Sequence, residues 1–303
     1  VIACSFKFKE HMMSKVWLVT GSARGLGREI VEAALRAGER VVATARDPRQ
    51  LAELLTRYGE QVRAVALDVT DPAAARHAVQ AAVDAFGRLD VVVNNAGFGH
   101  LSPFEQTTED DFRAQIDTNF YGVVNVTRAA LPVMREQRAG HIIQISSVGG
   151  RVGVAGLSAY QAAKWAVGGF TEVISQELAP FGVHVTALEP GGMKTDWGTG
   201  ASAAMPTLLP DYVPSIGAVV EMLSHHIGHE TGDPAKVAQV VLKLAYHDAL
   251  PAHLLLGSDA LHYAGEADKA RAASGEAWRA ISAATDFSAP SPLPPFPAAS
   301  AKA

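Results

Sequence analysis

Short apolar runs alternate with segments of helical periodicity along most of this chain, and this alternation constrains its fold more than any other feature. The apolar runs, rich in Val, Ile and Leu, are predicted to be strands at residues 16–20, 40–45, 62–67, 89–94, 141–146, 184–189 and 253–256. Apolar residues recur at helical spacing in residues 25–37, 49–58, 72–86, 109–138, 157–181 and 234–247. Strands that are apolar on both faces are typical of a parallel sheet covered by helices on both sides.

Right-handed crossovers between such strands give one α/β domain, a Rossmann-type doubly wound parallel seven-stranded sheet with helices on both faces. The chain has 303 residues, of which 48% are hydrophobic, so it is long enough to bury one large core.

The first strand is followed by a glycine-rich turn, TGSARGLG at residues 20–27, and then by a helix. Glycines let the backbone approach a pyrophosphate closely, and a helix N-terminus offers free N–H groups and the positive end of a dipole. A strand, a glycine turn and a helix in this order favour dinucleotide binding over an ordinary tight turn.

Tyr160 and Lys164 lie four residues apart and project from one face of a predicted helix. A lysine ammonium about 4 Å from a phenol favours the phenolate by about 4 kcal/mol at an effective dielectric near ~20. That energy could lower the tyrosine pKa from ~10 by about three units, towards ~7, where a general acid–base catalyst works best. Such pairs also occur by chance, so the interpretation depends on the rest of the sequence.

The motifs follow several predicted strands at their carboxyl ends, which meet at one edge of a parallel sheet. Asp68 follows the third strand, residues 94–97 the fourth, Ser147 the fifth and Pro190 the sixth, while the glycine turn follows the first. We therefore expect one functional site at this edge.

These motifs together resemble the short-chain dehydrogenase/reductase family, in its short, non-extended branch. The resemblance rests on the Gly-xxx-Gly-x-Gly turn of Gly21, Gly25 and Gly27, on NNAG at residues 94–97, and on Asn119, Ser147, Tyr160, Lys164, Pro190 and Gly191. It runs from about residue 16 to about residue 259. The extended branch of the family spaces its glycines as Gly-xx-Gly-xx-Gly, and this chain departs from that pattern.

The resemblance implies hydride transfer between a nicotinamide cofactor and a carbonyl or alcohol. Ser147 would donate a hydrogen bond to the reacting oxygen, and Tyr160 would exchange the proton with it. Lys164 would lower the tyrosine pKa and hold the nicotinamide ribose, and Asn119 would fix a water in the proton path. Ser146 competes with its neighbour, but the spacing to the tyrosine favours Ser147.

The resemblance also implies a set of cofactor contacts at the turn and the strand ends: Gly21, Ser22, Arg24, Gly25, Leu26, Gly27, Arg46, Asp68, Val69, Asn95, Ala96, Gly97, Tyr160, Lys164, Pro190, Gly191 and Thr195. Asp68 would accept a hydrogen bond from the adenine amino group. Thr195 would contact the nicotinamide carboxamide or simply cap a helix ahead of Asp196.

The end of the second predicted strand favours NADP(H) over NAD(H). Ala45 stands where an NAD enzyme of the family carries a carboxylate, and Arg46 and Arg24 could bind a 2′-phosphate. The nearby Asp47, and the option that both arginines are solvated surface residues, keep NAD(H) open as the alternative.

Residues 192–232 are expected to form an apolar, adaptable lid over the substrate. Its only lysine is Lys194 and it contains no arginine, so we expect a hydrophobic ketone, aldehyde or secondary alcohol rather than an acyl-carrier or coenzyme thioester. Expected substrate contacts are Phe98, Val148, Leu157, Met193, Trp197, Met205, Leu208 and Tyr212. The lid residues could equally pack as core or as a dimer interface.

Charge and composition exclude other classes of partner. A net charge of −5 without a basic stripe argues against nucleic acid, and the sequence has no apolar run long enough for a membrane span. The single cysteine, Cys4, rules out an intramolecular disulfide and suits the cytoplasm. His225, His226 and His229 are interpreted as a solvated helix end, and no metal site is expected.

The chain ends carry three further expectations. Residues 1–12 lack periodicity and precede Met13, so we expect them to be left from expression, ahead of a domain at residues 13–259. Residues 260–303 form an extension, a helix to residue 283 and then a Pro/Ala-rich tail from residue 288. Residues 109–138 and 157–181 would pair with those of a second copy in a homodimer or homotetramer.

Two other functions stay open at this point. One is an NAD-dependent oxidation of a secondary alcohol or hydroxysteroid, and the other is a non-catalytic dinucleotide sensor. A sensor has no need of a tuned phenol, so the intact set of Asn119, Ser147, Tyr160 and Lys164 favours the enzyme.

Overall fold

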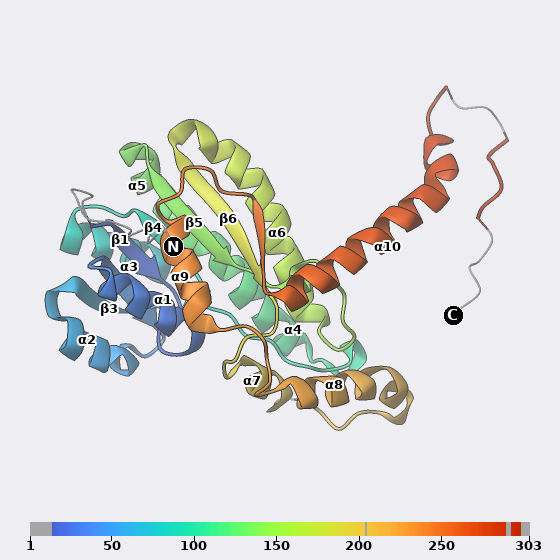
Figure 1. The fold of residues 1–303 in the computed structure, drawn as a ribbon, viewed down its shortest axis with the longest axis horizontal. Helices are drawn as coiled ribbons and strands as arrows, with labels where there is room; N and C mark the ends of the chain where they lie inside the picture. The colour runs from blue at the N-terminus through green and yellow to red at the C-terminus, as the bar shows by residue number, and fades with distance from the viewer. Residues whose placement is uncertain (1–13, 204, 289–291, 298–303) are drawn as a thin grey trace, which may run out of the picture.

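The computed structural model describes residues 14–203, 205–288 and 292–297, and it shows one sheet between two layers of helices (Figure 1). The expectation for residues 1–12 lies outside these residues. The strands are β1 (Val16–Val19), β2 (Arg40–Ala45), β3 (Val62–Ala66), β4 (Val91–Asn94), β5 (Gly140–Ile145), β6 (Val183–Pro190) and β7 (His253–Leu256).

The seven strands form one parallel sheet in the order β3-β2-β1-β4-β5-β6-β7. The order reverses between β1 and β4, which pair from Trp17 opposite Val91 to Val19 opposite Val93. This confirms the predicted Rossmann-type sheet, with each strand within about two residues of its expected bounds. In folds of this type, ligands bind outside the carboxyl ends of the two strands at such a reversal. We call this region, at the ends of β1 and β4, the crevice.

Helices connect and cover the strands. They are α1 (Gly25–Arg36), α2 (Ala52–Tyr58), α3 (Pro72–Phe86), α4 (Glu109–Ile116), α5 (Gly122–Gln137), α6 (Ser158–Leu178), α7 (Trp197–Ala203), α8 (Ala218–His226), α9 (Pro234–Leu244) and α10 (Ser258–Ala283). The single helix predicted over residues 109–138 is wrong in one respect, because a π-helical turn at Asp117–Tyr121 separates α4 from α5. Such a turn often marks a functional site.

Each face of the sheet has its own core. On one face, Leu26 and Ile30 of α1 and Val241 of α9 pack against Trp17 and Val19 of β1. On the other face, residues of α3, α5 and α6 pack against Val16, Leu18, Val42, Val92, Ile142 and Val185. Successive strand residues therefore point into opposite cores, which explains why the strands are apolar at every position.

The segment at residues 192–232, for which the sequence predicts an adaptable lid, is mostly helical. It contains α7, a short turn at Pro210–Tyr212, a π-helical turn at Val213–Gly217 and α8. In Figure 1 these elements lie at the end of the sheet where the strands terminate in the crevice.

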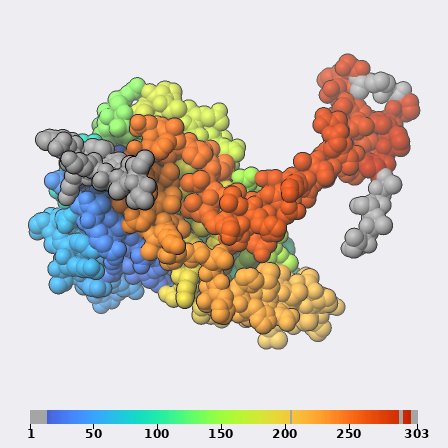
Figure 2. Space-filling view, in the orientation of Figure 1, coloured from blue at the N-terminus to red at the C-terminus, as the bar shows by residue number. Residues whose placement is uncertain are grey.

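Helix α10 projects away from the body as an arm (Figures 1 and 2). Ala260 and Ala264 in its first two turns are buried, whereas nearly all residues beyond them are exposed. Farther out, Trp278 packs against Phe296 with ring centroids 5.5 Å apart. No helix of the described residues is long and apolar enough to cross a membrane.

We predict that Trp17→Ala lowers the free energy of unfolding by about 3–5 kcal/mol, because it leaves a cavity in the centre of the sheet core. Trp17 is fully buried, whereas the matched control Trp278 is 43% exposed on the arm. Urea unfolding followed by circular dichroism measures both. Trp278→Ala is expected to change the same free energy by less than about 1 kcal/mol, and an equal loss in both variants would contradict the assignment of the core.

Candidate active site at the carboxyl edge of the sheet

Hydrogen bonds clamp the glycine turn to the end of β4. The hydroxyl of Thr20 accepts from the backbone N–H groups of Asn95, at 2.9 Å, and Ala96, at 3.0 Å. The amide of Asn95 donates in return to the carbonyls of Thr20, at 2.9 Å, and Gly21, at 3.2 Å. The turn is thus held rigidly over the crevice between β1 and β4.

Glycine is required at two positions of this turn. Gly21 has φ +67°, and a Cβ there would lie 2.9 Å from the Cα of Ala96. A Cβ at Gly27 would lie 2.3 Å from the carbonyl oxygen of Gly21 and 2.4 Å from the amide of Asn95. The close packing lets α1 begin directly behind the turn.

The N-terminus of α1 suits an anion. Its N-cap residue, Arg24, makes no side-chain capping hydrogen bond, and the first turn carries no acidic residue. The free N–H groups and the positive dipole end therefore face the crevice without a competing carboxylate. The residues present fit a dinucleotide pyrophosphate.

Ser22 and Leu26, two residues of the predicted cofactor set, direct their side chains into the protein. The Ser22 hydroxyl donates to the carbonyl of Val19, at 2.8 Å, and its backbone N–H donates to the carbonyl of Thr44, also at 2.8 Å. The Leu26 side chain packs in the core. At these two positions the side chains support the turn from inside.

Tyr160 lies in the first turn of α6 and is only 8% exposed. The ring of Trp197, at the start of α7, covers it with centroids 5.0 Å apart. Gly99 packs against both rings, and a Cβ there would lie 2.9 Å from each. The Ser147 side chain lies within hydrogen-bonding reach of the phenol, and its hydroxyl also accepts from the N–H of Gly149 at 3.0 Å.

Lys164 lies one turn further along α6 and is 4% exposed. Its Nζ donates to the carbonyl of Ile145 at 2.7 Å and lies 5.6 Å from the centroid of the Tyr160 ring. Gly97 approaches the same ammonium, because a Cβ there would lie 3.7 Å from it. The predicted pair is therefore brought together beside Ser147 and the NNAG segment.

The pKa of Tyr160 departs from the sequence expectation. Burial raises it to about 12, and the hydrogen bond with Ser147 only partly opposes that rise. Burial also lowers the pKa of Lys164 to about 8. The expectation of a tyrosine pKa near ~7 is wrong for this closed arrangement, because burial disfavours the phenolate and the ammonium of Lys164 donates to the Ile145 carbonyl rather than to the phenol.

Asn119 lies in the π-helical turn and is fully buried. Its amide donates to the carbonyls of Phe98 and Gln115, both at 2.7 Å, and its Oδ1 accepts from the N–H of Phe98 at 3.1 Å. All the polar atoms of its side chain are thus engaged in holding the segment after β4. Its Oδ1 keeps one lone pair free to accept a further hydrogen bond.

The end of β2 carries exposed positive charge. Arg46 and Arg24 are exposed, and within the described residues neither forms an ion pair. Asp47 is bound by Arg49, whose guanidinium donates to it at 2.8 and 2.9 Å. The carboxylate that kept NAD(H) open is thus already paired. Asp68, after β3, accepts from Thr70 through one oxygen.

The segment after β6 closes the crevice from the opposite side. Pro190 ends the strand, and Thr195 lies opposite the glycine turn, with its Cβ 3.8 Å from where a Cβ of Gly25 would stand. The Thr195 hydroxyl accepts from the N–H of Trp197 at 3.4 Å. Both expected roles of this threonine, a cofactor contact and a helix cap, are therefore open to it geometrically.

The predicted substrate contacts divide into two groups. In the first group, Trp197 packs against the Tyr160 ring, Val148 directly follows Ser147, and Leu157 directly precedes α6. Phe98 follows the NNAG segment, and its N–H donates to Asn119. Met193 instead packs against the core on the α1 side. The Tyr212 hydroxyl donates to Glu105 at 2.6 Å, and Met205 and Leu208 are half-buried on the lid.

The lid is tied to the segment after β4. Gln106 donates to the carbonyl of Thr207 at 2.8 Å and accepts from the N–H of Leu209 at 3.1 Å. Leu101 donates its N–H to the carbonyl of Ala201 at 3.0 Å. These contacts, which were not foreseen from the sequence, hold α7 and its Trp197 over the site.

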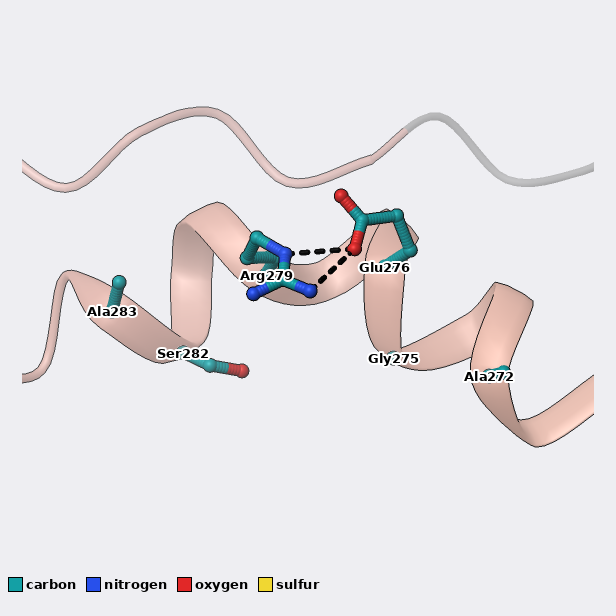
Figure 3. A pocket seen from close by; sticks show the side chains of 6 residues that line it. All are labelled: Ala272, Gly275, Glu276, Arg279, Ser282 and Ala283. Atoms are coloured by element: carbon teal, nitrogen blue, oxygen red, sulfur yellow. Dashed lines mark hydrogen bonds and ion pairs between the residues drawn. The ribbon is translucent and has the colours of Figure 1, made fainter.

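Two other candidates in the described part of the chain, a metal site and a surface pocket, carry no comparable chemistry. Among the described residues no group of His, Cys, Asp and Glu could hold a metal, and His225, His226 and His229 are exposed. A shallow pocket on the arm is lined only by residues of α10 (Figure 3): Ala272, Gly275, Glu276, Arg279, Ser282 and Ala283. Its charged pair, Glu276 and Arg279, is already joined. The crevice is therefore the candidate active site.

Residues 15–205 match the family model described as short chain dehydrogenase. The chain belongs to the short-chain dehydrogenase family. Oxidoreductase BOA17 of Botryotinia fuckeliana is 50% identical over 274 residues, which cover 90% of this chain and 100% of that protein. The family confirms the predicted resemblance and makes this chain an oxidoreductase.

Solved structures agree with this family assignment. A short-chain dehydrogenase from Streptomyces avermitilis has a TM-score of 0.84 and 37% identity, covering 91% of this chain and 100% of its own. A 3-ketoacyl-(acyl-carrier-protein) reductase from Brucella melitensis, complexed with NADH, has a TM-score of 0.68 and 26% identity, covering 80% and 96%. The family binds a nicotinamide dinucleotide, NAD(H) or NADP(H).

We predict that the charge on Lys164 costs stability at neutral pH. A lysine pKa lowered from 10.5 to about 8 corresponds to about 3 kcal/mol. The folded state releases this proton first, so the penalty is complete below pH ~8 and fades as the pH rises towards ~10.5. Lys164→Met should therefore be more stable than the parent at pH ~7, by up to about 3 kcal/mol, and this advantage should shrink above pH ~8.

Urea unfolding across this pH range measures the difference between the two proteins. Lys243→Met is the matched control, because Lys243 is exposed in the last turn of α9. A Lys164→Met protein that is less stable than the parent at every pH would contradict the buried charge.

Proposed function

We propose that this protein is an NADP(H)-dependent carbonyl reductase that reversibly reduces a hydrophobic ketone or aldehyde, with Tyr160 as the general acid and base. The observation that carries the proposal is the buried phenol of Tyr160, beside the hydroxyl of Ser147 and one helical turn from Lys164. This group lies at the same sheet edge as a glycine turn whose free helix N-terminus suits a pyrophosphate.

The bound nicotinamide would supply the hydride, and the residues of this chain would handle the proton. Tyr160 is protonated at neutral pH, since burial holds its pKa at about 12. It is therefore a hydrogen-bond donor ready to protonate the oxygen of a carbonyl substrate. The hydroxyl of Ser147 would donate a second hydrogen bond to the same oxygen and stabilise its developing charge.

Lys164 and Asn119 would support this proton transfer. The Lys164 ammonium, which lies 5.6 Å from the centroid of the Tyr160 ring, would stabilise the tyrosinate that remains after the proton is given up. Its lowered pKa, about 8, lets it take part in proton exchange with solvent near neutral pH. Asn119 would keep the Phe98 segment in place and offer a carbonyl oxygen to a water.

The preference for NADP(H) is supported by the charges at the end of β2. Ala45 carries no carboxylate to repel a 2′-phosphate, Asp47 is paired with Arg49, and Arg46 and Arg24 are exposed. A guanidinium binds a phosphate through two parallel hydrogen bonds. Asp68, which uses only one oxygen on Thr70, could accept from the adenine amino group.

An apolar substrate is supported by the lid. Trp197 packs on the Tyr160 ring at an interplanar angle of 49°, and the same lid contains Leu208 and Tyr212 further along the chain. Opening of α7 would free the face of Tyr160 that Trp197 now covers. A substrate that replaces Trp197 there would meet an aromatic and aliphatic wall.

A homodimer or homotetramer and a cytoplasmic location complete the proposal. Large apolar side chains of the α5 and α6 region are exposed: Tyr121 at 52%, Trp165 at 45% and Val173 at 55%. A second copy would cover them. The one cysteine of the sequence, Cys4, is compatible with a reducing compartment.

We predict that Tyr160→Phe lowers kcat for reduction of an aromatic or aliphatic ketone by about 10²–10⁴-fold, because the proton donor is removed. Binding of NADPH should persist, since the glycine turn is intact. Initial-rate kinetics with NADPH and a panel of ketones measure kcat, and the fluorescence of bound NADPH measures cofactor binding. Tyr121→Phe, an exposed tyrosine, is the control, and turnover retained in Tyr160→Phe would exclude the mechanism.

We predict that Arg46→Ala weakens NADPH binding by about 10–100-fold and leaves NADH binding nearly unchanged, because a charge-assisted phosphate contact is lost. Titration of each reduced cofactor, followed by its fluorescence, measures both constants. Arg128→Ala, which removes an equal charge from the exposed side of α5, is the control. Equal losses for both cofactors would exclude the assignment, and a parent protein that prefers NADH would favour the NAD-dependent alcohol dehydrogenase.

A further inference from the structure

Asp259 lies at the start of α10, yet its carboxylate reaches the segment that follows β6. Its Oδ2 accepts from the backbone N–H of Gly192 at 2.8 Å. Its Oδ1 is buried and has no hydrogen-bond partner among the described residues. Asp259 as a whole is half-buried, and a carboxylate with one buried oxygen that has no partner needs an explanation.

Glycines make room for this carboxylate. A Cβ at Gly191 would lie 2.2 Å from Oδ2 and 2.3 Å from Oδ1, and a Cβ at Gly257 would lie 2.5 Å from Oδ1. Gly257 also has φ +111°, a backbone conformation that other residues rarely adopt. Only glycine therefore fits at both places while Asp259 keeps its position.

The same short segment is held on every side by hydrogen bonds. The N–H of Gly191 donates to the carbonyl of Leu256 at 3.0 Å, and the carbonyl of Gly192 accepts from the N–H of Gly232 at 2.9 Å. Lys194 donates its N–H to the carbonyl of Gly232 at 3.1 Å. Asp259 supplies the one side-chain contact in this group, and the others come from the backbone.

The held segment leads directly to the two side chains that close the crevice. Three residues after Gly192 comes Thr195, opposite Gly25 of the glycine turn, and five residues after it comes Trp197, which covers Tyr160. Among the described residues, Asp259 forms its hydrogen bond with Gly192 and not with either of these side chains. A shift at Gly192 would nevertheless reach both, because only Met193 and Lys194 separate Gly192 from Thr195. Gly232, the bridge partner of Met193, also bonds Gly192.

We propose that Asp259 is a positioning residue, whose carboxylate holds Gly192 so that Thr195 and Trp197 stay over the dinucleotide and substrate sides of the crevice. The first turn of α10 thereby completes the site from the C-terminal part of the chain. A negative charge there is also stabilised by the positive end of the α10 dipole. The expected effect on cofactor binding rests on the proposed function. The expected effect on the mobility of residues 190–197 does not depend on it.

Hydrogen–deuterium exchange of the cofactor-free protein tests the anchor itself. In Asp259→Ala, peptides that cover residues 190–197 should exchange at least about tenfold faster than in the parent, because a charge-assisted hydrogen bond is lost. Asp259→Asn keeps an acceptor for the Gly192 N–H and should stay within about threefold of the parent. Asp268→Ala is the matched control, since Asp268 lies on α10 but binds Arg151 and Arg271.

Cofactor titration provides the second readout. In Asp259→Ala, the Kd for NADPH should rise by about tenfold or more, with a larger change in the KM for the cofactor than in kcat, and Asp259→Asn should restore most of the binding. Unchanged exchange of residues 190–197 in Asp259→Ala would overturn the inference. Faster exchange in a protein whose parent binds neither dinucleotide would instead support the anchor and overturn the proposed function.

Folding of the variants is checked on peptides of β5, which should keep the exchange of the parent. If Asp259→Ala fails this check, the test is repeated with Asp259→Ser. A serine hydroxyl suits the first turn of a helix but is too short to reach Gly192. Faster exchange at residues 190–197 in the serine variant, with β5 unchanged, supports the anchor, and parent-like exchange there overturns it.

Discussion

The hydrogen bonds between Thr20 and Asn95 are the interaction on which the rest of the site depends. β1 and β4 are neighbours at the centre of the sheet although they are far apart in sequence, and the strand order reverses between them. The Thr20 hydroxyl and the Asn95 amide join the two chain turns at this reversal. These bonds consequently join three segments into one unit: the glycine turn, the start of α1 and the NNAG segment. The other parts of the site are arranged around this unit.

The described structure places the catalytic candidates in a closed, water-poor setting, and this setting reverses the simplest electrostatic expectation. Burial acts on both members of the pair by favouring their neutral forms, so Tyr160 holds its proton more tightly and Lys164 less tightly. A protonated phenol next to a hydroxyl is the state that suits a proton donor. Trp197, whose ring packs against Tyr160, contributes to this burial.

The sheet and most helices could be predicted because strand and helix periodicities are local properties of the sequence. The convergence of the site residues followed from parallel topology alone. Other features depend on tertiary contacts that no spacing reveals. The π-helical turn around Asn119, the inward hydrogen bonds of Ser22 and the helical lid all arise from packing against distant segments. The pKa of Tyr160 escaped prediction for the same reason, because a spacing of four residues says nothing about Trp197 or the Ile145 carbonyl.

The contacts around Gly191 and Gly192 have a consequence for the order in which this chain is made. A ribosome synthesises the glycine turn early, and N-terminal parts of a chain can begin to fold while the remainder is still being made. Gly232, Leu256 and Asp259 emerge much later, yet they hold the segment that carries Thr195 and Trp197. The glycine turn and the NNAG segment are thus synthesised well before the residues that hold Thr195 and Trp197 in place. The site can close only after β7 and the first turn of α10 have left the ribosome.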